Sequence, residues 1–591
     1  MDRNSAIGLT LITVILLGYF LWFSPPPPPV DPATTPAQAP VTAAPTNDTP
    51  LAAPVVSDSI LAATYGDLST AFKGEEKIIT LETEDLKINF SNKGGIITEL
   101  ELKKFKTYSQ EPLKLITPAN NEFKLLTQYQ GKEIDLYSLY YETQQQQAGD
   151  TTVITFQVSL ANGASLTQRY AVPASGYEIN YSIIGKSFTE LLSGEQFSLK
   201  WSNILLPVEK DLNETRINST VTYATESGYD ELSQRSNETE TETFTEAVKW
   251  VAIKEKFFLA ALITKGQAFT GGQIQKSTNL SDSSVVKRAN INVSLPLKSI
   301  AEGKADFKFY IGPNDYQVIK HIADDFEENV YLGWRPVFWI NKFIIFPVFH
   351  FLTKYITNYG LIIFILVLLL KLVLLPLSYK SYLSMAKMRV LKPELDEIKE
   401  RVGDDMTKVQ QESMKLYQQV GVNPLSGCIP VLLQMPLILA MFYLFPNSIE
   451  LRQQSFLWAE DLSTYDSLLQ LPFTMPFNLG SHISLFTVIM TISTLIYTWQ
   501  NNQISSVTGP MKSMSYIMPV AFFFMLNSFP AGLTFYYFVS NLVTFAQQFI
   551  IKRFVDEDKI KNLMEENRKR IAAGGGGTKS KFMSKLQEAM K

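Results

Sequence analysis

Residues 360–377 of this chain read GLIIFILVLLLKLVLLPL, an apolar run interrupted by a single charge, Lys371. A run of this length can span a bilayer as a helix. A lysine at the centre of a membrane helix costs about 2.5 to 3.5 kcal/mol on insertion scales, so the charge needs a partner or a function. The competing interpretation is snorkelling, because Ser378 lies only roughly 10 Å of helix further along and a long side chain could reach the membrane surface.

The composition of the whole chain limits the possible classes of protein. With 591 residues the chain is long enough for several domains, and a polar first half precedes an apolar second half. The net charge of -4 gives no argument for nucleic-acid binding. A single cysteine, Cys428, excludes a disulfide framework, and with only three histidines there is no zinc pattern. We therefore expect no metal and no cofactor.

The N-terminal segment, residues 1–24, is predicted to be a transmembrane anchor. Its apolar run at residues 6–23 ends in bulky aromatic side chains and not in the small residues of a cleavage site, which favours an anchor over a cleaved signal peptide. Residues 25–57 are rich in Pro, Ala and Thr, a composition that is typical of an extended linker.

Residues 58–329 are predicted to form a large antiparallel β-sandwich. Apolar and polar residues alternate with a period of two in several segments, for example at Leu86, Ile88 and Phe90. No recognisable catalytic set lies in this region, so the chain is not expected to be an enzyme. Trp201 and Trp250 could stack on a sugar if exposed, although core packing is the favoured interpretation of both.

The second half is predicted to be a multi-pass α-helical membrane protein. Residues 330–356 mix aromatic and basic residues, and Pro336 and Pro347 are expected to break any long helix, so this segment is predicted to lie along the membrane interface. Together with the anchor, five further candidate spans give six. These five are Asn358–Ser378, Pro424–Phe445, Ile483–Gln500, Met514–Phe529 and Leu533–Ile551.

Basic residues assign the sides of the membrane. The loop at 379–422 and the tail at 554–591 are rich in Lys and Arg, whereas the loop at 447–482 contains only Arg452. Positive residues concentrate on the cytoplasmic side. The sequence therefore predicts cytoplasmic N- and C-termini and an external sheet domain.

Polar residues recur on one face of two of the predicted spans, at helical spacings. These residues are Thr487, Thr491, Thr494 and Thr498 in one span, and Thr534, Tyr537, Asn541, Thr544 and Gln548 in the other. Taken with Gln434 and Lys371 they indicate a shared hydrated cavity. Hydrogen bonds between neighbouring helices, worth about 0.6 to 2 kcal/mol each, are the competing interpretation of a single stripe.

The loop at 379–422 is predicted to be a helical hairpin, with helices at Ser381–Arg401 and Met406–Val420, an N-cap at Asp405 and a C-cap at Gly421. Methionines such as Met385, Met388, Met406 and Met414 provide adaptable apolar contacts, and covering another face of the protein is an equally good explanation. The basic tail, with its Gly574–Gly577 run, could contact anionic lipid or RNA, or be an idle solvated segment.

Seven short motifs together resemble the bacterial YidC membrane-protein insertase family, which includes mitochondrial and chloroplast insertases. The motifs are SMAKMR (384–389), VGDD (402–405), NPLSGCIP (423–430), QMP (434–436), SIELR (448–452), PAGL (530–533) and YYFVSNLVT (536–544). They occur in order within residues 334–553 and are highly specific. The outer domain is similar to the large periplasmic domain of Gram-negative members, a sandwich of the sugar-mutarotase type.

The resemblance implies a five-helix core at 357–553 in the cell inner membrane, around a hydrophilic groove that receives nascent membrane proteins. It also implies a cytoplasmic hairpin that contacts substrates, through Met385, Lys387, Met388 and Arg389 at its motif, and a monomeric mechanism. The implied partners are the Sec translocon, the ribosome, the targeting receptor and the lipid bilayer. A solute transporter with an outer sugar-binding domain is the second hypothesis, and a structural scaffold is the third. The lack of an acidic chain inside the spans argues against an ion-coupled transporter.

One groove position departs from the family pattern. The family typically has Arg at this position, and here the residue is Lys371. Arginine grips a carboxylate with a two-pronged fork, whereas lysine is a point charge. We therefore expect attraction of acidic substrate segments to be weaker or more sensitive to pH.

Overall fold

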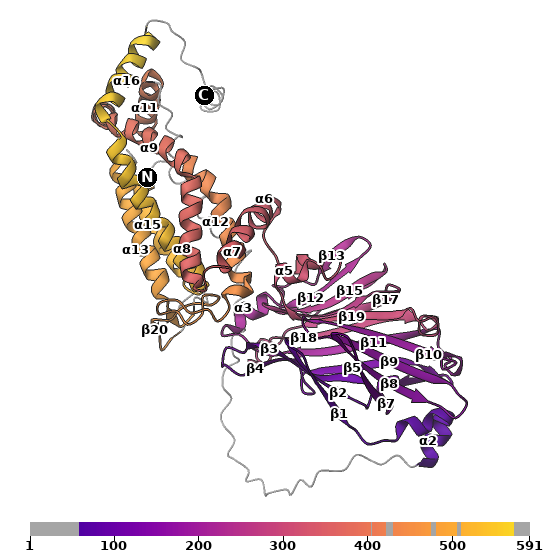
Figure 1. Cartoon of the computed structure of the whole chain (residues 1–591). Coiled ribbons are helices and arrows are strands. Elements are labelled where there is room, and N and C mark those ends of the chain that lie inside the picture. Colours follow the sequence, from indigo (N-terminus) through magenta and orange to yellow (C-terminus); the bar gives the residue numbers. More distant parts are fainter. Residues whose placement is uncertain (1–57, 404, 421–428, 474–479, 505–509, 573–591) are drawn as a thin grey trace, which may run out of the picture.

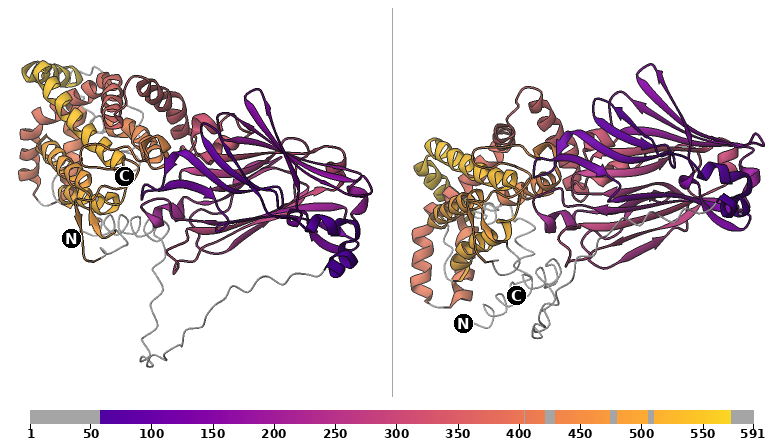
Figure 2. Two further views of the ribbon diagram at one scale, coloured as in Figure 1. Left: turned by 60° about the horizontal axis from the view of Figure 1, so that its bottom comes forward. Right: turned by 90° about the horizontal axis from the view of Figure 1, so that it is seen from below.

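The computed structural model describes residues 58–403, 405–420, 429–473, 480–504 and 510–572. The predicted anchor, the linker, the cap at Gly421 and the Gly574–Gly577 run lie outside these residues. The described chain forms a sheet domain followed by a helical half, and the two meet at one end of the sheets (Figures 1 and 2).

The sheet domain contains three antiparallel sheets of four, nine and six strands. The four-stranded sheet has the order β1-β2-β3-β4, and the other two have the orders β13-β12-β15-β16-β19-β10-β9-β8-β7 and β14-β17-β18-β11-β5-β6. The strands are β1 Ile78–Glu82, β2 Leu86–Ser91, β3 Ile96–Lys106, β4 Pro112–Ile116, β5 Asn121–Tyr129, β6 Lys132–Asp135, β7 Glu142–Ala148, β8 Thr151–Ser159, β9 Ser165–Pro173, β10 Glu178–Lys186, β11 Gln196–Leu205, β12 Thr220–Thr225, β13 Gly228–Glu231, β14 Glu240–Thr243, β15 Val248–Lys254, β16 Phe258–Thr264, β17 Gly271–Ser277, β18 Lys287–Pro296 and β19 Ala305–Pro313.

The period-two pattern places one face of each strand in a common core. Leu86, Ile88 and Phe90 of β2 are all fully buried. Phe90 packs against Phe156 of β8, with ring centroids 6.1 Å apart, so the four-stranded sheet lies on one part of the nine-stranded sheet. The six-stranded sheet packs elsewhere on the same core, where Phe123 meets Phe309 at 6.0 Å. The predicted antiparallel β-rich domain is confirmed.

Both tryptophans that could have stacked on a sugar are core residues. The side chains of Trp201 and Trp250 are 0% exposed. Each indole N–H is used inside the domain, by Asn121 Oδ1 at 2.6 Å and by the Asp324 carbonyl at 3.0 Å. Core packing, the favoured interpretation, is confirmed.

The helical half consists mainly of long helices that run away from the sheet domain (Figure 1). These are α6 Arg335–Ile340, a π-helical segment at Asn341–Ile345, α7 Phe346–Thr353, α8 Tyr359–Val373, α9 Leu375–Val390, α10 Lys392–Val402, α11 Met406–Val420, α12 Ile429–Asn447, α13 Leu485–Ile504, α14 Pro510–Leu526, α15 Ala531–Phe554 and α16 Glu557–Ala572. The shorter elements outside the strands are α2 Asp58–Tyr65, α3 Leu212–Ile217, α4 Lys298–Ala301, α5 Tyr316–Ile319, β20 Leu469–Gln470 and β21 His482–Ile483, with 3-10 turns that include Thr189–Leu191, Phe326–Asn329 and Ile449–Leu451.

Prolines shape these helices differently from the sequence prediction. The helix at Arg335–Thr353 is continuous, so the expectation that Pro336 and Pro347 break it was wrong. Pro336 lies in the first turn, where its missing N–H costs nothing, and the π-helical segment ends at Ile345, two residues before Pro347. The predicted span at 358–378 is instead divided, because α8 ends before Pro376 and the axis turns by 63° into α9. The first hairpin helix is divided in the same way, at Leu391 before Pro393.

Among the described residues, one helix, Arg335–Thr353, is long enough and apolar enough to cross a bilayer by itself. The bent pair α8–α9 meets the same criteria if it is taken as one broken span, and Ser513–Leu526 is apolar but shorter. The number of spans is therefore still a prediction.

The sheet domain and the helical half share buried contacts. A second hydrophobic cluster begins on the nine-stranded sheet at Trp250 and Tyr310 and continues to Phe346 of α7 and Phe445 of α12. Next to it the guanidinium of Arg452 forms a buried ion pair with Glu209, Nε to Oε1 2.8 Å. Both apolar packing and a buried ion pair therefore join the two halves.

Candidate functional site

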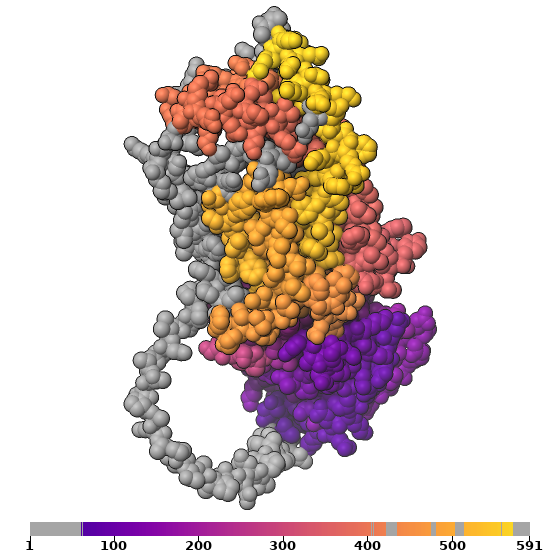
Figure 3. Space-filling view, turned by 90° about the vertical axis from the view of Figure 1, so that its left-hand side faces the viewer, coloured from indigo at the N-terminus to yellow at the C-terminus, as the bar shows by residue number. Residues whose placement is uncertain are grey.

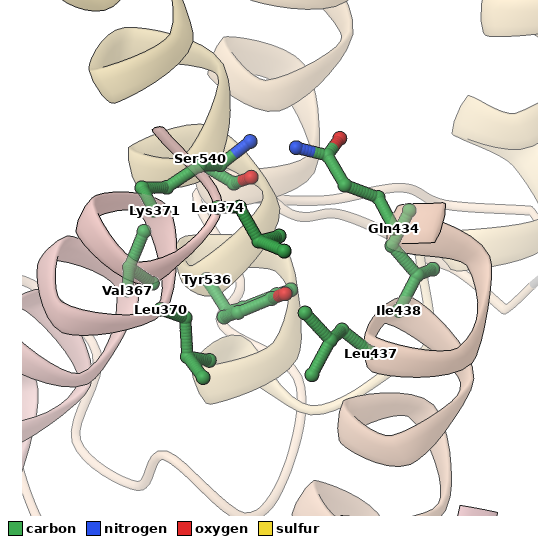
Figure 4. A pocket seen from close by; sticks show the side chains of 9 residues that line it. All are labelled: Val367, Leu370, Lys371, Leu374, Gln434, Leu437, Ile438, Tyr536 and Ser540. Atoms are coloured by element: carbon green, nitrogen blue, oxygen red, sulfur yellow. The ribbon is translucent and has the colours of Figure 1, made fainter. Parts of the chain in front are cut away.

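A small hollow with a mixed lining of apolar and polar side chains lies between α8, α12 and α15. It measures about 20 Å³, enough for roughly one water molecule. Its lining residues are Val367, Leu370, Lys371, Leu374, Gln434, Leu437, Ile438, Tyr536 and Ser540. Figure 4 shows the ends of Lys371 and Gln434 directed toward one another from α8 and α12, above the ring of Tyr536.

Lys371 is buried within the protein and is only 6% exposed. Its Nζ donates a hydrogen bond to Thr544 Oγ1 at 2.8 Å, and that hydroxyl donates to the Ser540 carbonyl at 2.7 Å. An ammonium group has three N–H donors, and among the described residues one of them is used, by Thr544. Within the described part of the chain, no carboxylate oxygen lies within 4.0 Å of Nζ. Among these residues the lysine is therefore held in place by a neutral group and not by an ion pair.

The backbone beside Lys371 is held by α15 as well. Gln547 Nε2 donates to the Lys371 carbonyl at 2.8 Å. This carbonyl lies near the C-terminal end of α8, where the last carbonyls have no partner within the helix. The bond therefore fixes the end of α8 just before its bend.

The threonine stripe of α13 is occupied largely by bonds within its own helix. Thr491 Oγ1 donates to the Thr487 carbonyl and Thr494 Oγ1 to the Met490 carbonyl, both at 2.8 Å. Thr487 Oγ1 donates to Ser484 Oγ at 2.8 Å and is fully buried. Such bonds to the preceding turn satisfy a hydroxyl without water. Thr498, one turn beyond Thr494, is partly buried.

Asn541 connects the two predicted stripes. Its Nδ2 donates to Ser493 Oγ and to Thr494 Oγ1, both at 2.9 Å, and so joins α15 to α13. The two stripes therefore face one another at this point, where their polar groups bond across the helix interface.

The stripe residues of α15 divide between two places. Thr544 reaches Lys371, whereas Thr534 is fully buried near the start of the helix and donates to the Ala531 carbonyl at 3.1 Å. Tyr537 and Gln548 are not among the residues that line the hollow. The structure thus brings Lys371, Gln434 and Thr544 together and leaves the other predicted groove residues along the helix interfaces.

Two lining residues, Tyr536 and Ser540, were missed. With Thr544 they recur at spacings of four, so they share one face of α15. Following that spacing back from Thr544 would have found both. Tyr537, which was chosen instead, lies on the adjacent face.

The predicted hairpin contacts lie on α9. Met385, Lys387 and Arg389 are partly buried there. Met388 packs against a third hydrophobic cluster, formed by α9, α10, α11 and α16. The predicted N-cap of α11 is confirmed, because Asp405 Oδ1 accepts from the Lys408 N–H at 3.1 Å.

The fold and this site define a membrane protein in which a helical core, with a buried lysine beside a small hollow, is joined to a large antiparallel sheet domain. Two family models match the chain, "60Kd inner membrane protein" over residues 351–559 and "YidC periplasmic domain" over residues 78–347. The chain belongs to the YidC family of membrane protein insertases. It is thus an inner-membrane protein with a periplasmic sheet domain, and its function is membrane protein insertion.

The curated relatives agree over the full length. The membrane protein insertase YidC of Cytophaga hutchinsonii is 46% identical over 614 aligned positions, covering 100% of this chain and 98% of the relative. That of Amoebophilus asiaticus is 42% identical, again with 100% and 98% coverage. A solved structure described as an active YidC insertase with its first transmembrane domain resolved has 20% identity, 81% and 95% coverage and a TM-score of 0.33. These relatives are named as insertases and not as enzymes, and family membership favours insertion over the solute-transporter hypothesis.

Proposed function

We propose that the chain inserts substrate helices through a hydrophilic groove whose buried centre is the hollow at Lys371. The observation that carries this proposal is a buried lysine whose ammonium group bonds to one neutral group among the described residues, inside an apolar helix bundle. Because a lysine at this depth costs about 2.5 to 3.5 kcal/mol, its retention points to use during insertion. Substrate carboxylates or unpaired backbone carbonyls are the groups that its donors would stabilise.

The size of the hollow suggests how a substrate helix passes. About 20 Å³ cannot hold a helix, so the substrate would move along the groove and not through a pore. Gln434 faces Lys371 from α12 and offers both donors and an acceptor to a passing backbone (Figure 4). Thr491, Thr494, Thr498 and Asn541 would extend the polar path along α13 and α15 when the bonds from Asn541 to α13 open.

We further propose the topology predicted from the sequence, with six spans, a five-helix core at 357–553 and both termini in the cytoplasm. The basic hairpin lies at the end of the helices remote from the sheet domain, as the positive-inside rule requires (Figure 1). The helix at Arg335–Thr353 would lie along the outer surface. In support, Lys342 near its middle lies over the ring of Tyr316 in α5, 5.9 Å from the ring centroid, so this helix packs beside the sheet domain.

The partners beyond substrate and lipid follow from the family resemblance alone. We propose that the chain works as a monomer, alone or with the Sec translocon, and that ribosomes and the targeting receptor approach the hairpin and the basic tail. Met385, Lys387, Met388 and Arg389 are the proposed hairpin contacts.

The groove proposal is tested by crosslinking. A photoreactive residue replaces Gln434 or Ser540. As a matched control it replaces Leu368, a residue of α8 that is 37% exposed. Ribosome-stalled single-span substrates should crosslink to the first two positions at every chain length that brings the span to the membrane. Crosslinks from Leu368 alone would contradict the groove.

A further inference from the structure

The C-terminal helix α16 covers the apolar face of the cytoplasmic hairpin. Ile560 and Met564 of α16 are 8% and 4% exposed, and they pack into the third hydrophobic cluster. The hairpin side of the cluster consists of Ala386, Leu391, Leu395, Ile398, Leu416, Tyr417 and Val420. In Figure 3 the yellow C-terminal helix lies directly against the orange hairpin.

The sequence of α16 matches this packing. Ile560 and Met564 are one helical turn apart and form one stripe, while Leu563 beside them is 50% exposed. Asp556 caps the start of the helix, since its Oδ1 accepts from the Asp558 and Lys559 N–H groups at 3.1 and 3.2 Å. The helix is therefore a defined element with a single docking face.

A polar contact closes the other end of α16. Arg568 Nη2 bonds to Glu394 Oε2 of α10, at 2.5 Å. Both side chains are more than 40% exposed, so this pair contributes little and mainly sets the register. The apolar stripe supplies most of the attachment, because burying a large apolar side chain contributes more than an exposed ion pair.

The same cluster includes residues that could otherwise meet a substrate. Met388 and Met414, two of the adaptable methionines of the hairpin, pack against it. An apolar face that is covered by α16 cannot contact a second helix at the same time. Docking of α16 and docking of another helix on this face therefore exclude one another.

We propose that α16 is an internal latch, which occupies the apolar face of the α10–α11 hairpin and must undock before that face can receive a substrate helix. Only the receipt of a substrate helix by this face rests on the proposed function. The docking itself is a property of the fold and can be measured in the absence of any substrate.

Hydrogen exchange of the full-length protein in lipid nanodiscs tests the docking. Met564→Asp places a charge in the cluster, and Leu563→Asp places the same charge on the exposed face of the same helix. We expect amides of α10 and α11 to exchange about tenfold faster, or more, in Met564→Asp, since an unpaired buried charge displaces the helix. Leu563→Asp should match the unaltered protein. Equal exchange in the two variants would overturn the latch.

A reversible lock gives an independent test that leaves the cluster intact. Cysteines introduced by Glu394→Cys and Arg568→Cys, with Cys428→Ser to remove the native thiol, replace two long side chains that meet at their tips. Because a direct disulfide needs a shorter distance between the two backbones, a bismaleimide with a disulfide in its linker bridges the pair. We expect the bridge to form, to slow exchange in the hairpin and to be released by reduction. Failure of the bridge to form would contradict the docked arrangement.

The lock also separates the two proposals. With a photoreactive residue at Met388, substrate crosslinks should disappear in the bridged protein and return after reduction. Undiminished crosslinks at Met388 in the bridged protein would contradict the latch. Absence of crosslinks at Gln434 in the reduced protein would contradict the groove and leave the exchange result for the latch unaffected.

Discussion

Lys371 is the residue on which the site depends. Its charge is buried between three helices, and its one described side-chain partner is the Thr544 hydroxyl. Snorkelling would direct the ammonium along α8 toward the membrane surface. The hydrogen bond instead holds it against α15, and the side chain lines the hollow opposite Gln434 (Figure 4). The side chain is thus placed to meet a substrate group between the helices.

Substitutions at Lys371 test whether insertion activity depends on the charge of this side chain. Lys371→Leu should reduce insertion of a single-span substrate with an acidic flank by about tenfold, the effect of losing one interaction of about 1.4 kcal/mol. Lys371→Arg should retain or exceed the original activity, since its fork can hold a carboxylate with two bonds. Insertion is measured by protease protection in proteoliposomes. Equal activity of all three proteins would show that the charge has no role.

Glu255, in the turn between β15 and β16, is a partly buried carboxyl group with a measurable consequence. One oxygen of its carboxyl group, Oε2, is enclosed and has no hydrogen-bond partner among the described residues. Burial, assisted by the nearby Glu209 carboxylate and opposed by Arg452, raises the pKa of Glu255 to about 8. The folded protein therefore holds a proton there that the unfolded chain, with the ordinary pKa of 4.5, releases.

The raised pKa of Glu255 determines how the stability of the folded protein changes with pH. Because the folded state binds more protons between pH 4.5 and about 8, the contribution of Glu255 to stability is complete below pH 4.5 and is lost as the pH rises to 8. The loss amounts to about 1.4 kcal/mol per pH unit. Glu255→Gln should flatten denaturant-unfolding midpoints over this range, whereas Glu190→Gln, on the exposed surface, should not. A slope that both variants retain would exclude Glu255 as its source.

Among the larger elements, the segment after α12 holds the sheet domain to the helices. The ion pair between Arg452 and Glu209 is buried on both sides, and Arg452 also donates to the Lys106 carbonyl. Beside it, Lys256 bonds to Glu214 at 2.9 Å and to the Ser463 carbonyl at 3.4 Å. The segment after α12 thus contacts two charged residues of the sheet domain. Arg452 bonds to Glu209, and the Ser463 carbonyl accepts from Lys256.

Removing one member of the buried pair should cost more than removing both. Arg452→Met leaves the Glu209 carboxylate buried without its ion pair, and we expect a loss of about 3 to 5 kcal/mol in unfolding free energy. The double variant Arg452→Met with Glu209→Met should recover most of this loss, since two apolar side chains need no partner. Denaturant unfolding of all three variants measures the difference. Additive losses in the double variant would show that the two charges act independently.

The sequence predicted elements whose pattern is local. Leu86, Ile88 and Phe90 alternate with polar residues, and the strand they predict is present with all three buried. The N-cap at Asp405 was predicted correctly because capping also depends on residues that are close in sequence. The bend at Leu374 was missed, because apolarity continues through Pro376 and hides the division of α8 from α9.

The site itself was predictable only in part. Lys371 stood out as a charge in an apolar run, but its partner Thr544 lies 173 positions away. Tyr536 and Ser540 could have been found by following the spacing of four back from Thr544, but that spacing identifies the face only once Thr544 is known to meet Lys371. The docking of α16 was missed because the segment after Phe554 is dominated by charge, and its short apolar stripe has meaning only beside the hairpin.

Across the whole molecule, the sheet domain and the basic hairpin lie at opposite ends of the long helices (Figure 1). The longest of these, α15, has 24 residues and is roughly 36 Å long, enough to cross a hydrocarbon core of about 30 Å. With the sheet domain in the periplasm, the proposed topology places the hairpin and α16 in the cytoplasm.

Single cysteines at the two ends test this orientation. In a protein made cysteine-free by Cys428→Ser, the substitution Ser159→Cys lies on exposed β8, and Glu400→Cys and Leu563→Cys lie on exposed faces of α10 and α16. A membrane-impermeant maleimide added to intact spheroplasts should label the first position at once. The other two should react only after the membrane is opened, because the basic residues of the hairpin and tail retain these segments in the cytoplasm. Labelling of Glu400→Cys in intact spheroplasts would reverse the proposed topology and, with it, the side from which substrates enter.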